Sequence, residues 1–171
     1  MLDMQLPEKL DVLVVLGSLS DKKMAEKMVP VFDDFGVRAH FSVCSAHRDH
    51  ERLAEMIPAA EKAGCKVVIG VAGMAAHLPG VIAALTVLPV IGVPCDGSLQ
   101  GLDALLAIAQ MPPGIPVATT AVNGGYNAAL LAIEILGSAD PALREKLLEF
   151  RVTMRQKNRA NDQELRDGLK N

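Results

Sequence analysis

The chain of 171 residues is 50% hydrophobic and 22% charged, and its net charge at pH 7 is −3. A chain of this length and composition can bury one substantial core, which excludes intrinsic disorder, collagen and a coiled coil as descriptions of the whole chain. Aromatic residues make up only 3% and no long basic block is present, so no nucleic-acid partner is expected.

Five short apolar runs, each followed by a helical pattern, make up the chain as far as residue 136. Such β-branched runs are typical of strands that are covered on both faces. In chain order they cover residues 11–16, 38–43, 66–71, 89–93 and 116–122. The helical patterns lie at 22–35, within 45–64, near 81–85, within 94–111 and at 127–136. Pro30 and Pro58 fall inside the first two helical patterns and suggest kinks or early turns there.

Strands that alternate with helices predict a parallel sheet with helices on both faces. We expect an α/β fold, a three-layer sandwich with a five-stranded, or nearly five-stranded, parallel sheet of flavodoxin- or Rossmann-like type. One domain is expected over residues 1–171, with its core at about 11–137 and an amphipathic C-terminal helix at about 139–168. That helix would dock on the core or on a neighbouring subunit through an apolar stripe of Leu143, Leu147, Phe150 and Met154.

Charge is nearly absent from residues 67–133, which contain only Asp96 and Asp103. The uncharged stretch from Val67 to Cys95 is long enough for a transmembrane helix, but its many Gly and Pro residues argue against a lipid-exposed span. An uncharged segment of this size predicts burial between subunits, because large exposed apolar patches usually mark interfaces. We therefore expect a homo-oligomer and no membrane partner.

The three cysteines are widely spaced, and the start of the chain lacks the basic and apolar segments of a secretion signal. An odd number of widely spaced cysteines is a poor disulfide framework. Reduced thiols and a location in the cytoplasm are therefore expected.

Small and polar residues gather in the five turns that leave the predicted strands. Because ligands bind outside the carboxyl ends of parallel strands, these turns are expected to converge on one site. They contain GSLSD (17–21), SAHR (45–48), the segment from Gly73 to Gly80, DGS (96–98) and NGG (123–125). The usual glycine-rich motifs for nucleoside triphosphates and dinucleotides do not occur in the sequence.

Within GSLSD, Ser18 and Asp21 are candidates for binding the phosphate or the sugar of a nucleotide at a helix start. The alternative is helix capping, in which Ser20 or Asp21 accepts hydrogen bonds from the first helical N–H groups. Taken alone, the motif favours capping.

Two histidines stand on neighbouring turns. His47 is a candidate general acid and base, because imidazole both accepts and returns protons near neutral pH, and the alternative is a solvated surface histidine. Arg48 offers a forked donor for phosphate or carboxylate. His77 lies in an apolar loop, where a buried, hydrogen-bonded core histidine is the alternative to a catalytic one. Cys44, His47 and His50 have a spacing that suggests metal ligands, but no fourth ligand is evident, so no metal is expected.

Four motifs occur in a fixed order: GSLSD after the first strand, SAHR after the second, AGMAAHLPG after the third and QMPPGIPVA before the fifth. Together they closely resemble the class I PurE family, the N5-carboxyaminoimidazole ribonucleotide mutases of purine biosynthesis, over about residues 11–136. The resemblance implies a homo-octamer with sites at subunit contacts, and an isomerase without metal or organic cofactor. Its reaction would convert N5-carboxyaminoimidazole ribonucleotide to 4-carboxy-5-aminoimidazole ribonucleotide by decarboxylation and recarboxylation.

The resemblance also implies roles for individual residues. His47 would be the general acid and base, and His77 a second catalytic residue in the loop around the migrating carboxylate. The ribonucleotide substrate and its phosphate would be bound by Ser18, Asp21, Ser45 and Arg48. The carboxylate pocket would be lined by Gly73, Ala75, Ala76 and Leu78.

The chain departs from the family pattern in three places. Met74 stands where the family has glycine, the segment VNGGYNAALLA is shorter than usual and lacks a lysine, and Lys22 stands where many members have Trp. Three alternatives remain open at this stage. They are an aminoimidazole ribonucleotide carboxylase that uses free CO2, a related nucleotide-binding carboxylase or decarboxylase, and a non-catalytic flavodoxin-like binding module.

Overall fold

The computed structural model describes residues 6–169, and residues 1–5 and 170–171 lie outside the described part. Residues 1–5 belong to the segment in which no secretion signal is expected. The chain divides into two compact units, one reaching to Ile133 and the other beginning at Glu134. The boundary falls a few residues before the end that was predicted for the core.

A five-stranded parallel sheet with the strand order β2-β1-β3-β4-β5 forms the centre of the first unit. Its strands are β1 (Val12–Leu16), β2 (Ala39–Val43), β3 (Val67–Ala72), β4 (Val90–Pro94) and β5 (Ala118–Thr119). Every residue of β1, β3 and β4 is buried, as expected for strands covered on both faces.

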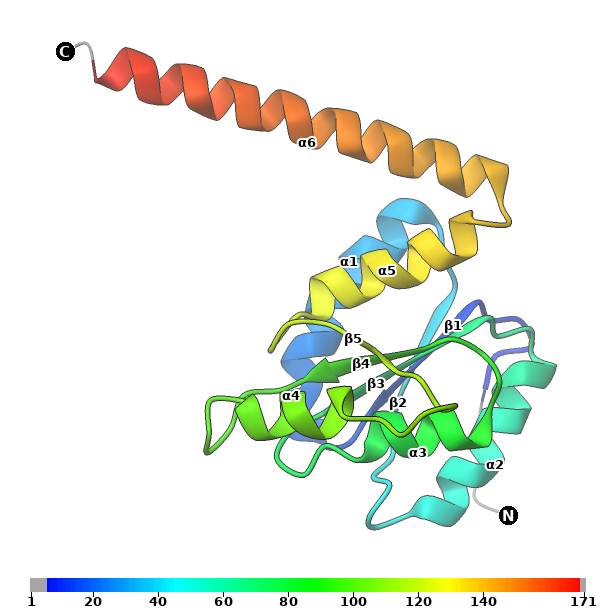
Figure 1. Ribbon diagram of the computed structural model, residues 1–171. Helices are drawn as coiled ribbons and strands as arrows, with labels where there is room; N and C mark the ends of the chain where they lie inside the picture. The colour runs from blue at the N-terminus through cyan, green and yellow to red at the C-terminus, as the bar shows by residue number, and fades with distance from the viewer. Residues whose placement is uncertain (1–5, 170–171) are drawn as a thin grey trace. The chain divides into compact units, whose positions relative to one another are not determined.

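Helices connect the strands and cover both faces of the sheet (Figure 1). One face is covered by α1 (Lys22–Phe35) and by the first-unit part of α5 (Gly125–Gly137), and the other by α2 (His50–Lys62), α3 (Leu78–Leu85) and α4 (Leu102–Ala109). A short 3-10 turn, η1 (Leu19–Asp21), precedes α1. This strand order is that of the flavodoxin-like folds, and the predicted three-layer α/β fold is confirmed.

The fifth strand is much shorter than predicted, two residues instead of the seven at 116–122. It pairs with β4 alone, through Ala118 and Thr119. Pro116 lacks an N–H to donate to a ladder, so regular pairing cannot begin there.

The helices α1 and α2 continue through Pro30 and Pro58 to Phe35 and Lys62, so the predicted early turns are wrong. Both prolines are exposed. Their rings therefore lie on the solvent side, where a carbonyl group that has lost its helical donor can bind water.

Two adjacent glycines allow α3 and α4 to approach the sheet closely. Gly70 of β3 is paired with Gly92 of β4. A Cβ added to Gly70 would lie 3.1 Å from Pro79 of α3, and one added to Gly92 would lie 2.3 Å from Ile108 of α4. The close packing fixes the start of α3 next to the sheet, and the loop before α3 carries His77.

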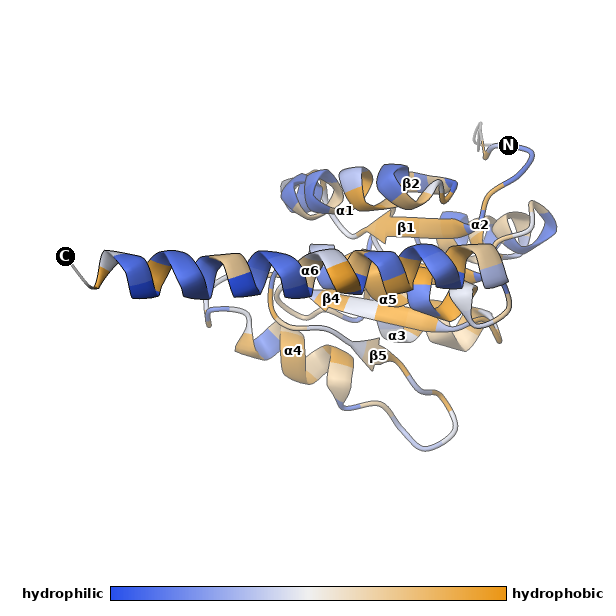
Figure 2. Cartoon of the chain, turned by 90° about the horizontal axis from the view of Figure 1, so that it is seen from above, coloured by the Kyte–Doolittle hydropathy of each residue, from blue (hydrophilic) through white to orange (hydrophobic). Residues whose placement is uncertain are grey.

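The described part of the second unit consists of the end of α5 and the long helix α6 (Pro141–Gly168). Asp140 caps α6 by accepting hydrogen bonds from the N–H groups of Ala142 and Leu143, at 3.0 and 3.1 Å. The helix is mostly hydrophilic, with interspersed apolar residues (Figure 2). A C-terminal helix is thus confirmed, while its docking surface stays a prediction. No helix within residues 6–169 combines the length and apolarity needed to cross a bilayer.

Candidate active site

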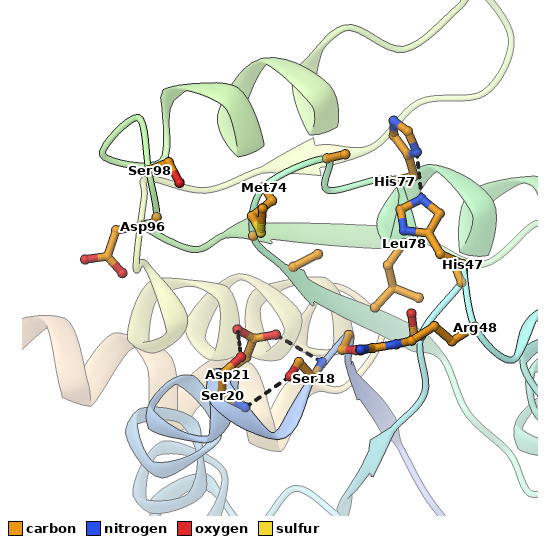
Figure 3. Close-up of a pocket in the computed structure, with 17 residues that line it drawn as sticks. Ser18, Ser20, Asp21, His47, Arg48, Met74, His77, Leu78, Asp96 and Ser98 are labelled. Atoms are coloured by element: carbon orange, nitrogen blue, oxygen red, sulfur yellow. Dashed lines mark hydrogen bonds between the residues drawn. The ribbon is translucent and has the colours of Figure 1, made fainter.

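A pocket of about 570 Å³ lies in the first unit at the carboxyl end of the sheet (Figure 3). The turns after β1, β2, β3 and β4 all contribute to it. It is lined by Gly17, Ser18, Ser20, Asp21, Ser45, Ala46, His47, Arg48, Ala72, Gly73, Met74, Ala75, His77, Leu78, Asp96, Gly97 and Ser98. In the order β2-β1-β3 the connections from β1 and β3 leave in opposite directions, and this switch point is where open α/β sheets bind ligands.

The turn after β1 is held by a reciprocal capping box. The Ser18 N–H donates to Asp21 Oδ2 at 3.1 Å, and the Ser20 N–H donates to Ser18 Oγ at 3.3 Å. Capping therefore occurs, but Ser18 and Asp21 cap the 3-10 turn η1. The expected cap of α1 is absent, because the side chain of Asp21 accepts no hydrogen bond from the first N–H groups of α1. Because a carboxylate oxygen accepts more than one hydrogen bond, this cap does not prevent Asp21 from also binding a ligand.

Burial is the largest influence on Asp21 and raises the pKa of its carboxyl group. The neighbouring thiol of Cys95, directly after β4, donates a hydrogen bond to that carboxyl group. Burial and nearby carboxylates raise the pKa of Cys95 to about 12, so the thiol stays protonated and remains a donor. Asp21 is thus a partly desolvated acceptor aimed into a pocket.

The turn after β2 places Arg48 against the end of β1. Its Nη2 donates to the backbone oxygen of Gly17 at 3.0 Å, while the backbone oxygen of Ser45 accepts from the N–H groups of Arg48 and Asp49 at 3.2 and 2.9 Å. The guanidinium has five N–H donors, so this one bond orients it and leaves donors for an anion.

The two histidines meet directly. His47 Nε2 and His77 Nδ1 are 2.8 Å apart, and the rings are T-shaped with centroids separated by 4.9 Å. One nitrogen must carry the shared proton and the other must accept it. Both side chains are exposed, so the alternative of a buried core histidine at position 77 does not hold.

The loop between β3 and α3 supplies the apolar wall of the pocket through Gly73, Ala75 and Leu78. Ala76 does not line the pocket; it is 1% exposed and belongs to the hydrophobic core beneath the loop. The alternation of exposed and buried residues in this loop explains the difference, since Ala75 and His77 face outward while Ala76 and Leu78 are buried.

Asp96, Gly97 and Ser98 line the pocket although no role was assigned to them individually. Their position directly after β4 is the signal that identifies them. The fifth turn acts indirectly, because Asn123 Oδ1 accepts from the Asp96 N–H at 3.2 Å and so positions the fourth turn.

Within residues 6–169, no group of three or more His, Cys, Asp or Glu side chains is arranged to hold a metal ion. Cys44 donates instead to the backbone oxygen of Asp49. All three cysteines are free and buried.

Known proteins that are similar to this chain belong to one family. Residues 11–157 match the model of the family described as AIR carboxylase. The chain is 47% identical over 159 residues to the N5-carboxyaminoimidazole ribonucleotide mutase of Methanocaldococcus jannaschii, with 93% of this chain and 99% of that protein covered. It is 52% identical over 143 residues to the protein of the same name from Pyrococcus abyssi, with 83% and 82% covered.

Two solved structures with related names are similar to this chain in fold. A substituted variant of Treponema denticola PurE2 superposes with a TM-score of 0.84 at 27% identity, over 92% of this chain and 98% of that one. Treponema denticola PurE gives a TM-score of 0.80 at 28% identity, over 90% and 97%. The similarity extends over most of the chain in both cases.

Proposed function

The chain belongs to the AIR carboxylase family, and we propose that it is an N5-carboxyaminoimidazole ribonucleotide mutase whose reaction takes place in the pocket described above. The resemblance to class I PurE is thereby confirmed, and the enzyme is an isomerase of purine biosynthesis. One observation carries the assignment of the site: a carboxylate, a guanidinium and a hydrogen-bonded imidazole pair line one pocket from three separate turns.

The ribonucleotide is oriented by charge. Its phosphate lies on the side of Arg48 and Ser45, because a guanidinium and a hydroxyl donate to phosphate oxygens. The same phosphate is repelled by the carboxylate of Asp21, so Asp21 and Ser18 receive the sugar hydroxyls instead. The proposed proton transfers require the aminoimidazole ring to lie within reach of His47, which lines the same pocket.

The reaction needs two opposite proton transfers. Cleavage of the N–C bond releases CO2 and leaves the electron pair on the exocyclic nitrogen, which takes a proton from His47. The ring carbon then attacks the CO2, and the proton on that carbon returns to the same imidazole. One group serves both steps because imidazole gives and accepts protons near neutral pH.

His77 assists as a catalytic residue at the carboxylate side of the pocket. Its Nδ1 lies 2.8 Å from His47 Nε2, which orients the His47 ring and provides a second nitrogen for the mobile proton. Between the two proton transfers, CO2 must stay near the ring carbon and away from bulk water. Gly73, Ala75 and Leu78 provide a small apolar surface for that purpose.

The test is incubation of the protein with N5-carboxyaminoimidazole ribonucleotide, with and without added bicarbonate, while the carbon-carboxylated product is followed. We expect turnover that does not depend on bicarbonate. Turnover that requires bicarbonate and ignores the N5-carboxylated substrate would assign the chain to the alternative, a carboxylase that uses free CO2. Nucleotide binding without any turnover, unaffected by His47→Asn, would support the non-catalytic binding module.

We also propose a homo-octamer in the cytoplasm. The octamer is what the family resemblance implies. Exposed large apolar side chains in the first unit support subunit contacts: Leu102 and Leu106 of α4 are 56% and 48% exposed, and Val87, before β4, is 99% exposed. The free cysteines suit a reducing compartment. Light scattering at micromolar concentration tests the assembly, and a monomer would contradict it.

A further inference from the structure

Met74 adopts a backbone conformation that L-residues rarely take. Its φ is +55°, and Gln100 (φ +54°) and Asn123 (φ +60°) are the other non-glycine residues with positive φ between residues 6 and 169. Asparagine tolerates this region better than most residues, and Asn123 uses its side chain to bind the Asp96 N–H. A methionine gains no such hydrogen bond from its position, and strain of this kind persists mainly at functional sites.

The conformation directs the Met74 side chain into the pocket rather than into the core. The residue is 64% exposed although it is large and apolar, and it lines the pocket. Its Cγ lies 3.9 Å from the position of a Cβ on Gly97, so it reaches the turn after β4. In Figure 3 it projects between the side that carries Ser98 and the side that carries His77. The side chain therefore stands in the pocket beside the turn after β4.

From this geometry we infer that Met74 is a flexible apolar cover that retains the CO2 released during the proposed mutase reaction. This inference rests on the proposed function. Free CO2 is small, neutral and weakly hydrogen-bonding, so walls rather than charged partners must hold it. An unbranched thioether side chain with three rotatable bonds adapts its shape to admit the substrate and then cover it. Met74 thus favours the carboxyl group of the bound substrate over CO2 from solution.

The test uses N5-carboxyaminoimidazole ribonucleotide labelled with 13C in its carboxyl group, in unlabelled bicarbonate with carbonic anhydrase present. Mass spectrometry of the product measures the label lost during turnover. The wild-type protein is expected to retain most of the label. Met74→Gly is expected to raise the lost fraction about threefold or more, because water and dissolved CO2 reach the ring, and Met74→Leu is expected to restore retention.

Gln100→Gly is the matched control. It relieves the same positive-φ strain at a residue that does not line the pocket. Because glycine adopts this conformation freely, both glycine variants are expected to keep the fold and raise Tm by about 2–4 °C. Only Met74→Gly is expected to lose label.

The outcomes separate the two proposals. If the wild-type protein does not convert the labelled substrate, the proposed function fails. If the wild-type protein converts the substrate, the proposed function stands. The role of Met74 is then refuted by either of two results: the wild-type protein loses the label, or Met74→Gly retains as much label as the wild type.

Discussion

Two aspartates near the ends of β1 show how differently the two ends of the sheet are built. Asp11, directly before β1, accepts from Arg38 Nε and Nη2 at 2.8 and 2.6 Å, and these bonds lower the pKa of its carboxyl group. Asp21 lies in η1, after β1. No Lys or Arg contributes to the shift of its pKa, and burial raises that pKa. The amino end of the sheet thus stabilises a charge, whereas the carboxyl end holds one at a cost in stability.

Other residues at the carboxyl end of the sheet are also held in arrangements that do not favour stability. Met74 is held at positive φ, and His47 and His77 are exposed around one hydrogen bond. Each feature costs stability or adds little to it, and each lines the pocket. Functional sites are commonly the places where local stability is given up. The comparison therefore predicts that substitutions at the carboxyl end change activity, and that those at the amino end change stability.

The largest effect is expected from His47→Asn. Loss of the group that moves both protons should lower kcat by about 10³-fold or more. The Kd of the nucleotide should change little, because the sugar and phosphate are held elsewhere in the pocket. Steady-state kinetics and calorimetric titration measure the two quantities separately. Retained turnover would remove His47 from the mechanism.

A smaller loss is expected at His77. His77→Ala removes both the hydrogen bond to His47 and the second nitrogen, and should lower kcat by about 10- to 100-fold. His77→Asn places an amide near the position of Nδ1 and can keep the hydrogen bond. If Asn restores most of the activity, His77 positions His47; if Asn is as poor as Ala, His77 carries the proton itself. Wild-type kcat in both variants would contradict either role.

Asp21→Asn should have opposite effects on binding and on stability. Losing a charged hydrogen bond of about 1.5–3 kcal/mol should raise the Kd of the nucleotide about 10- to 150-fold. Asn can still accept from the Ser18 N–H, so the cap is preserved. Calorimetric titration measures the loss of affinity.

The stability effect of Asp21→Asn follows from the sign of the pKa shift. A raised pKa in the folded state means that folding favours the protonated form, so the cost of the charge appears as the pH rises through that pKa. At pH 7 the variant should therefore melt at the same temperature as the wild type or above it. A lower Tm with unchanged affinity would show that Asp21 is structural.

Much of this arrangement follows from the sequence, and the rest depends on contacts that sequence cannot specify. Apolar runs predicted the sheet, because burial on both faces leaves a strong pattern. Of the five turns expected to converge on one site, four line the pocket and the fifth, at 123–125, does not. The bounds of β5 were overestimated, since pairing at an edge depends on a single neighbour. The direct contact between His47 and His77 depends on the paths of two loops, and the burial of Ala76 depends on the path of one of them. No periodicity in the sequence describes such paths.

The smallest effect is expected at the amino end. Asp11→Asn breaks an exposed but forked ion pair and should lower Tm by about 1–3 °C at pH 7, with kcat and Kd unchanged. The lowered pKa of Asp11 means that its contribution is complete above the ordinary value of 3.8 and is lost as the pH falls through the lower, folded-state value. The difference in Tm from the wild type should therefore shrink in strong acid and, by screening, at high salt. If Asp11→Asn instead lowered kcat while Asp21→Asn left binding intact, the assignment of stability to the amino end of the sheet and of activity to the carboxyl end would be refuted.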